Sequence, residues 1–288
     1  MRTLHFRPPA GAVDCHAHVF GPFARFPLAE GRGYTPRQAT FEDYQAMLGR
    51  VGFDRAVLVQ GSPHGTDNAA MLDALARDRM NLRGIAVVDP GITQDELERF
   101  ARAGVRGIRM SDALRLGTPL AFLERFAVRL RPLGWHIQVH VRHCDDLVAL
   151  APRLHRLGIP VLIDHMASVV PRDGLEAPGF RQLVELLSSS DDVWVKVASF
   201  YRRSTTGHPY ADMGVYAGAL ATARPDRIVF GTNWPHPDRM GAPPDDADLL
   251  DVLAGWCPDA ALQHRILVDN PERLFGFAPL NPPSRPTT

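Results

Sequence analysis

Eight short apolar runs, rich in valine and isoleucine, alternate with longer amphipathic segments along this 288-residue chain. Such alternation is typical of repeated βα units, in which each strand is followed by a helix. The expected strands cover residues 12–20, 55–60, 82–89, 105–111, 136–141, 160–166, 193–199 and 227–234. The clearest expected helices lie between them at residues 67–79, 94–103, 119–131 and 145–157. Gly104, Gly134 and Gly158 stand where helices should end before the next strand.

Eight strands with intervening helices predict an α/β fold of the (β/α)8 TIM-barrel type. A doubly wound sheet is the alternative, but no glycine-rich phosphate-binding loop follows the first expected strand. No linker or shift in composition divides the chain, so we expect one domain. It comprises a barrel over residues 1–275 and a proline-rich C-terminal tail over residues 276–288.

Charge and hydropathy narrow the class of protein. Lysine and arginine together number 32, as do aspartate and glutamate, which gives no electrostatic reason to expect nucleic acid or an anionic membrane as partner. No apolar run approaches the length of a transmembrane helix, and the N-terminus lacks the apolar core of a secretory signal. The three cysteines are far apart and form no disulfide framework or metal-binding pair. We expect a cytoplasmic protein, and whether it forms a homo-oligomer is left open.

The first expected strand contains the most informative motif, Val13-Asp14-Cys15-His16-Ala17-His18-Val19-Phe20. Because strand side chains alternate between faces, His16 and His18 point the same way and lie about 7 Å apart. Two imidazoles so placed can share a metal ion, a carbonyl oxygen or a proton. The ordinary alternative is a pair of surface histidines on an edge strand.

Polar residues at the other strand ends favour a site, because the active sites of such barrels lie at the carboxyl ends of the strands. They are Ser62, His64, Arg109, Arg115, His140, Asp164, His165, Lys196, Tyr201, Arg202, Arg203, Asn233 and His236. Arg106 and Arg109 are three residues apart on one strand, so only one of them points inward. An inward Arg109, with Arg115 and Arg202 near the mouth, predicts a carboxylated substrate, because guanidinium pairs with carboxylate in a bidentate fork.

These residues resemble the amidohydrolase superfamily, and within it the 2-pyrone-4,6-dicarboxylate lactonases and related lactone hydrolases. The matching stretches are residues 11–22, 64–70, 83–90, 163–166 and 231–237. The resemblance implies a barrel that hydrolyses a cyclic ester without a metal ion, with His16, His18 and His165 polarising the lactone carbonyl. The residues expected to contact the substrate are Tyr34, Ser62, His64, Arg109, Arg115, His140 and Arg202.

The chain departs from this family at two strand ends. Asn233 stands where the family normally has an aspartate that takes a proton from water, and an amide cannot take that proton. The expected proton acceptor is therefore His236 or His140. His140 replaces a tyrosine and restores a position that binds a divalent ion in metal-dependent members. We expect no cofactor, with zinc held by His16, His18 and His140 as the alternative.

The first hypothesis is a hydrolase that opens a carboxylated lactone, similar to 2-pyrone-4,6-dicarboxylate or a muconolactone, in aromatic-compound catabolism. Its expected catalytic residues are His16, His18, His165, Asn233 and His236. One alternative is a metal-dependent decarboxylase or other amidohydrolase. Another is a catalytically silent relative that binds an acidic aromatic metabolite, which the missing aspartate would favour.

Overall fold

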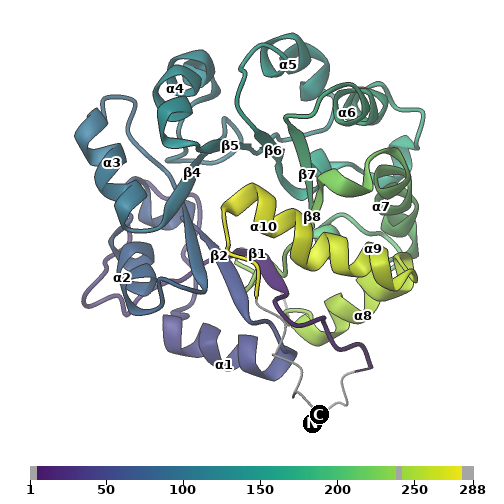
Figure 1. The fold of residues 1–288 in the computed structure, drawn as a ribbon, viewed down its shortest axis with the longest axis horizontal. Helices are drawn as coiled ribbons and strands as arrows, with labels where there is room; N and C mark the ends of the chain where they lie inside the picture. Colours follow the sequence, from purple (N-terminus) through teal and green to yellow (C-terminus); the bar gives the residue numbers. More distant parts are fainter. Residues whose placement is uncertain (1–4, 238–241, 281–288) are drawn as a thin grey trace, which may run out of the picture.

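The protein is a (β/α)8 barrel, as the sequence predicts (Figure 1). The computed structural model describes residues 5–237 and 242–280. Its strands form one parallel sheet in the order β1 to β8. They are β1 (Val13–Ala17), β2 (Arg55–Val59), β3 (Leu82–Ala86), β4 (Val105–Met110), β5 (His136–Val139), β6 (Val161–Ile163), β7 (Val193–Val197) and β8 (Ile228–Phe230).

Helices surround the sheet and bury their apolar sides against it (Figure 1). They are α1 (Phe41–Val51), α2 (Ala69–Arg77), α3 (Gln94–Arg102), α4 (Leu123–Leu130), α5 (Asp146–Leu154), α6 (Pro178–Ser189), α7 (Ala211–Ala223), α8 (Asp246–Trp256), α9 (Ala260–His264) and α10 (Asn270–Phe275). Thr40 and Thr93 begin α1 and α3 with capping boxes, which satisfy amide groups that a helix start leaves unpaired. Gly104, Gly134 and Gly158 adopt the positive φ expected of residues that end a helix.

Asp14 fixes the junction between the first and last strands. Its carboxylate accepts hydrogen bonds from the amide (2.9 Å) and hydroxyl (2.7 Å) of Thr232 and from the hydroxyl of Tyr44 (2.9 Å). Beside it, the amide of Asn233 donates to the carbonyl oxygen of His16 at 2.8 Å. The β1 histidines and the loop after β8 are therefore held together by buried hydrogen bonds.

Several strands end earlier than the sequence predicts. Strand β6 ends at Ile163 rather than at residue 166, and β8 ends at Phe230 rather than at residue 234. After β6 the chain turns into a left-handed segment, His165–Ser168, with φ between 49° and 56°. This backbone cannot continue a strand, so the polar residues expected at the ends of these strands lie in loops.

Residues on both sides of the predicted boundary between barrel and tail, at residue 275, pack against the barrel. Helix α10 lies across the end of the barrel where the strands begin (Figure 1), and Phe275 and Phe277 are both buried there. Phe277 belongs to the barrel because the guanidinium groups of Arg55 and Arg83 stack on its ring. The predicted tail beyond residue 280 lies outside the described residues.

The structure also describes the three cysteines and the length and apolar character of the helices. Cys15, Cys144 and Cys257 are buried free thiols, in agreement with the absence of a disulfide framework. Among the helices of residues 5–237 and 242–280, none has the length and apolar character needed to cross a membrane.

Candidate active site

A cavity of about 530 Å³ opens at the end of the barrel where the strands finish. Most of the predicted site residues line it, because each lies at the end of a strand or in the loop that follows one. Those that do are His18, Tyr34, Ser62, Arg109, His140, His165, Arg202 and Asn233. Ser168, Ser199, Tyr201 and Arg203 also contribute to its wall.

Four predicted residues do not line the cavity. His16 is fully buried, with its ring 4.6 Å from that of His165 and 4.9 Å from that of His18. Nδ1 of His64 bonds to the carbonyl oxygen of Pro27 at 3.0 Å, and its ring stacks on Phe20. Arg115 is exposed, and His236 is buried away from the cavity. These four residues are therefore not placed in direct contact with a ligand of the cavity.

The neutral rings of His18 and His140 both present an acceptor nitrogen. Nδ1 of His18 donates to the carbonyl oxygen of Val59 at 2.8 Å, which leaves Nε2 without a proton. The hydroxyl of Ser111 donates to the carbonyl oxygen of His140, so Nδ1 of His140 is the donor toward that hydroxyl. Burial and the charge of Arg109 lower the pKa of each ring to about 3. Both rings are therefore uncharged at neutral pH.

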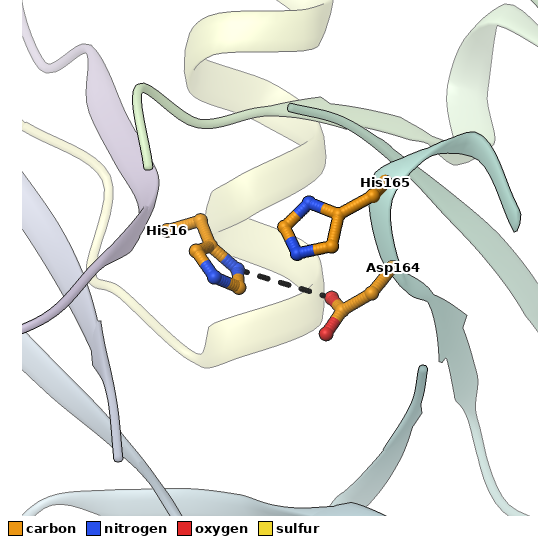
Figure 2. A group of neighbouring side chains, drawn as sticks. All are labelled: His16, Asp164 and His165. Atoms are coloured by element: carbon orange, nitrogen blue, oxygen red, sulfur yellow. Dashed lines mark ion pairs between the residues drawn. The ribbon is translucent and has the colours of Figure 1, made fainter. Parts of the chain in front are cut away.

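A buried charge cluster lies beneath the cavity around the Asp164 carboxylate, which Figure 2 shows beside His16 and His165. The Asp164 carboxylate meets Lys196 Nζ at 3.1 Å and Arg109 Nε at 2.7 Å, and Lys196 donates to His16 Nδ1 at 3.0 Å. Burial alone would raise the pKa of Asp164, but Lys196 and Arg109 hold it well below its usual value. Arg109 also donates from Nη2 to Nε2 of His165 at 3.2 Å, so its guanidinium is held from two sides.

The donors at this cluster do not fit a resident divalent ion. His16, Asp164 and His165 place ligand atoms within 4.8 Å of one another (Figure 2), whereas the predicted zinc set was His16, His18 and His140. Nε2 of His16 and Nδ1 of His165 are buried without a hydrogen-bond partner, as metal ligands could be. The only carboxylate of the set is already shared by Lys196 and Arg109. A divalent ion would be repelled by each of these cations by about 4 kcal/mol per unit charge at 4 Å.

At the end of β8, a chain of hydrogen bonds connects Asn233 to a carboxylate. Asn233 Nδ2 donates to Tyr201 Oη at 2.9 Å, and Tyr201 Oη lies 2.7 Å from His236 Nδ1. His236 Nε2 lies 3.0 Å from Asp246 Oδ1. Both ring nitrogens of His236 therefore have protein partners. Asp246, which was not among the predicted site residues, is contributed by the first turn of α8.

The charge of the cavity wall is positive. Arg109, Arg202 and Arg203 line it, and the described lining residues include no aspartate or glutamate. Tyr34 and Ser62 add hydroxyl groups to the same wall. A cavity of this composition suits an anionic ligand, because each guanidinium can form charge-assisted hydrogen bonds with an oxyanion.

Comparison with known proteins gives consistent matches. A family model described as amidohydrolase matches residues 13–277. The 4-sulfomuconolactone hydrolase of Rhizobium radiobacter is 40% identical over 95% of this chain and 92% of that protein. The 2-pyrone-4,6-dicarboxylate hydrolase of Comamonas testosteroni is 38% identical over 94% of this chain and 92% of that protein. A crystal structure of a probable 2-pyrone-4,6-dicarboxylic acid hydrolase from Acinetobacter baumannii, with citric acid bound, is 29% identical and superposes with a TM-score of 0.81, covering 93% of this chain and 100% of that one.

Proposed function

The chain belongs to the amidohydrolase family, and on that premise we propose that it is a hydrolase that opens an anionic lactone in aromatic-compound catabolism. The observation that carries the proposal is the cavity wall, which combines three arginines with uncharged histidines. The names of the relatives support the reaction class, since two of them are hydrolases of lactones that carry acidic groups.

Substrate binding falls to the outer residues of the cavity. Arg202 and Arg203 follow β7 and remain exposed, so their guanidinium groups can meet a carboxylate as it enters. The hydroxyls of Tyr34 and Ser62 lie on the same wall and add hydrogen bonds to the ring or its substituents. Arg115 is left as a group of the outer surface.

Polarisation of the lactone carbonyl falls to Arg109. The role first expected of His18 needs an N–H aimed at the cavity, but the proton of His18 is engaged by Val59. Arg109 is only 5% exposed and is oriented by Asp164 and His165, which leaves further N–H groups for a developing oxyanion. His165 thus acts by holding Arg109 in place.

Orientation of the water falls to His18 and Asn233. The backbone amide of His18 donates to the carbonyl oxygen of Trp234, the residue after Asn233. This hydrogen bond holds the segments of His18 and Asn233 side by side. Nε2 of His18 is an acceptor for a water hydrogen, and the Asn233 side chain faces the same cavity. We place no metal ion in this reaction, because Lys196 and Arg109 already supply the positive charge around Asp164.

The test is a substrate screen with metal analysis. Purified protein is incubated with 2-pyrone-4,6-dicarboxylate, 4-sulfomuconolactone and an uncharged lactone of similar size, and ring opening is followed by absorbance. We expect hydrolysis of an anionic lactone, weak or no hydrolysis of the uncharged one, and less than stoichiometric zinc. Release of carbon dioxide from an aromatic acid, with no lactone opened, would instead support the decarboxylase alternative.

A further inference from the structure

The hydrogen-bonded chain behind Asn233 leads from the cavity wall into the protein interior. Tyr201 lines the cavity, whereas His236 and Asp246 lie behind it, and each of the three residues is 5% exposed. The three contacts measure 2.9, 2.7 and 3.0 Å and run from Asn233 to Tyr201, His236 and Asp246 in that order. They join the segment after β7, the loop after β8 and the first turn of α8.

The partners fix the direction of each hydrogen bond. The Asp246 carboxylate can only accept, so Nε2 of His236 carries a proton and donates to it. Nδ1 of the neutral ring is then an acceptor, and it receives the O–H of Tyr201. The Tyr201 oxygen accepts in turn from the Asn233 amide, and the neighbouring Arg202 guanidinium also bonds to Tyr201. Tyr201 is thus set to lose its proton toward His236 and to gain one at the same oxygen.

His18 and His140, which line the cavity, are poor acceptors of a proton. A protonated His18 or His140 would be a second cation beside Arg109, and their pKa values of about 3, set by burial and by Arg109, reflect this. A protonated His236 would instead lie against the Asp246 carboxylate, which would stabilise the imidazolium. Arg50 Nη2, on α1, lies 3.8 Å from the other oxygen of Asp246.

We propose that Tyr201 relays the proton of the attacking water to His236, which is the net proton acceptor, and that Asp246 is the positioning residue that holds the His236 ring. The proposal rests on the proposed lactone hydrolysis. As the water oxygen bonds to the lactone carbonyl carbon, one water proton moves to Tyr201 Oη, and the phenol proton moves to His236 Nδ1. The reverse transfer delivers this proton to the departing ring oxygen when the carbon–oxygen bond breaks. No charge is created or lost, and no further reactant is needed.

The resting state of this relay is compatible with an anionic substrate. Burial raises the pKa of Tyr201, so the phenol keeps its proton until the water attacks. A tyrosinate held permanently in this wall would repel the anion that Arg202 attracts. The relay also accounts for Asn233, which donates to Tyr201 and needs no basicity of its own.

The proposal is tested with Tyr201→Phe, which keeps the ring and removes the proton-carrying oxygen. We expect kcat to fall by about 10²- to 10⁴-fold, while KM changes by less than about threefold. Tyr216→Phe is the matched control, because the Tyr216 hydroxyl bonds to the carbonyl oxygen of Pro171 and lies outside the cavity wall. This control should keep the wild-type kcat.

Rescue separates a proton relay from a merely structural tyrosine. Adding Asn233→Asp to Tyr201→Phe places a carboxylate in the cavity wall, and we expect kcat to recover at least tenfold. A folded Tyr201→Phe with wild-type kcat, or a loss that Asn233→Asp does not recover, would overturn the relay and leave the hydrolase assignment intact. A wild-type protein that opens no lactone would overturn the proposed function and the relay with it.

A second variant covers the case in which Tyr201→Phe does not fold. Asp246→Asn keeps the shape of the side chain but removes the charge that stabilises a protonated His236. We expect kcat to fall at least tenfold with KM unchanged. A fall in thermal stability with kcat intact would assign Asp246 to structure alone and overturn the relay.

Discussion

At the end of the barrel where the strands begin, Arg55 donates to the carbonyl oxygen of Gly11 (2.9 Å) and to Glu272 (2.8 Å). Arg83 donates there to the carbonyl oxygens of Leu82 (2.8 Å) and Gly276 (2.9 Å). At the opposite end, Arg202 and Arg203 are exposed in the cavity wall. Arginine side chains thus hold the C-terminal segment in place at one end of the barrel and offer hydrogen-bond donors to a ligand at the other. The difference is one of exposure, because Arg203 donates to the carbonyl oxygen of Arg142 at 3.3 Å and Arg202 bonds to Tyr201, yet both side chains remain exposed.

The backbone differs between the two ends as well. Within residues 5–237 and 242–280, the non-glycine residues with positive φ all lie in segments that follow strands, on the cavity side. They are Leu116, His165, Met166, Ala167, Ser168, Ser199, Tyr210, Asn233 and His236. Such conformations cost free energy and persist only where the surrounding structure holds them. At the end where the strands begin, positive φ falls on glycines such as Gly104, Gly134 and Gly158, whereas at the end with the site it also falls on larger residues.

Arg55→Met gives the largest expected effect on stability. It leaves Glu272 and the carbonyl oxygen of Gly11 without their partner in a buried setting, which typically costs about 3–5 kcal/mol. Urea denaturation should show this loss, while kcat and KM for the anionic lactone stay near wild type in the folded fraction. A changed KM with unchanged stability would break the division between the two ends.

His165→Asn tests the cavity end, and asparagine is chosen because it tolerates the positive φ of this position. Arg109 loses the ring that holds Nη2, so we expect kcat/KM to fall by about 10²- to 10³-fold. The midpoint of thermal unfolding should move by only a few degrees. Insoluble or unfolded protein would assign His165 to the core instead.

Arg202→Met sharpens the comparison between arginines. A hydrogen bond to a charged group contributes about 1.5–3 kcal/mol, so KM for an anionic lactone should rise about ten- to hundredfold. Stability should not change, since the side chain is exposed. An unchanged KM would remove Arg202 from the substrate site, and Arg203→Met would then be measured in the same way.

The last expected effect, which appears only as the pH falls, concerns His136, at the start of β5. Burial lowers its pKa to about 3, against 6.5 for an ordinary histidine. Between these two values the unfolded chain binds one more proton at this position, so the free energy of unfolding decreases as pH falls from 6.5 toward 3. His136→Gln should make that dependence shallower by about 1.4 kcal/mol per pH unit. Equal slopes for the two proteins, measured by urea denaturation, would contradict this assignment.

The fold and the outer part of the site could be predicted because they follow from local pattern. Apolar runs of strand length repeat eight times, and strand ends place His18, Arg109 and Asn233 at one mouth. A strand end specifies which mouth a residue reaches but not how deep its side chain lies. His236 follows β8 as expected, yet both of its ring nitrogens are bonded behind the cavity.

Residues contributed by the outer helices and by the segment after the last helix could not be predicted from local sequence pattern. Asp246 lies in the first turn of α8, where an acidic residue is common because it interacts favourably with the helix dipole. No sequence pattern around Asp246 indicates that its side chain contacts His236. Phe277 lies after the last helix and reads as the start of a tail, although tertiary packing buries it. Contacts of this kind depend on the closed barrel rather than on local pattern.

The left-handed turn of His165–Ser168 has a consequence for protein engineering. A left-handed conformation costs an ordinary residue about 1–2 kcal/mol, and glycine escapes most of that penalty. Selection for heat resistance would therefore favour glycine at Ala167, where only a methyl group is lost, and not at Met166, whose buried side chain contributes more than the penalty. Glycine at Ala167 would loosen the loop that presents His165 and Ser168 to the cavity. Thermally improved descendants of this enzyme should be slower catalysts, and a screen on melting temperature alone would move the population away from activity.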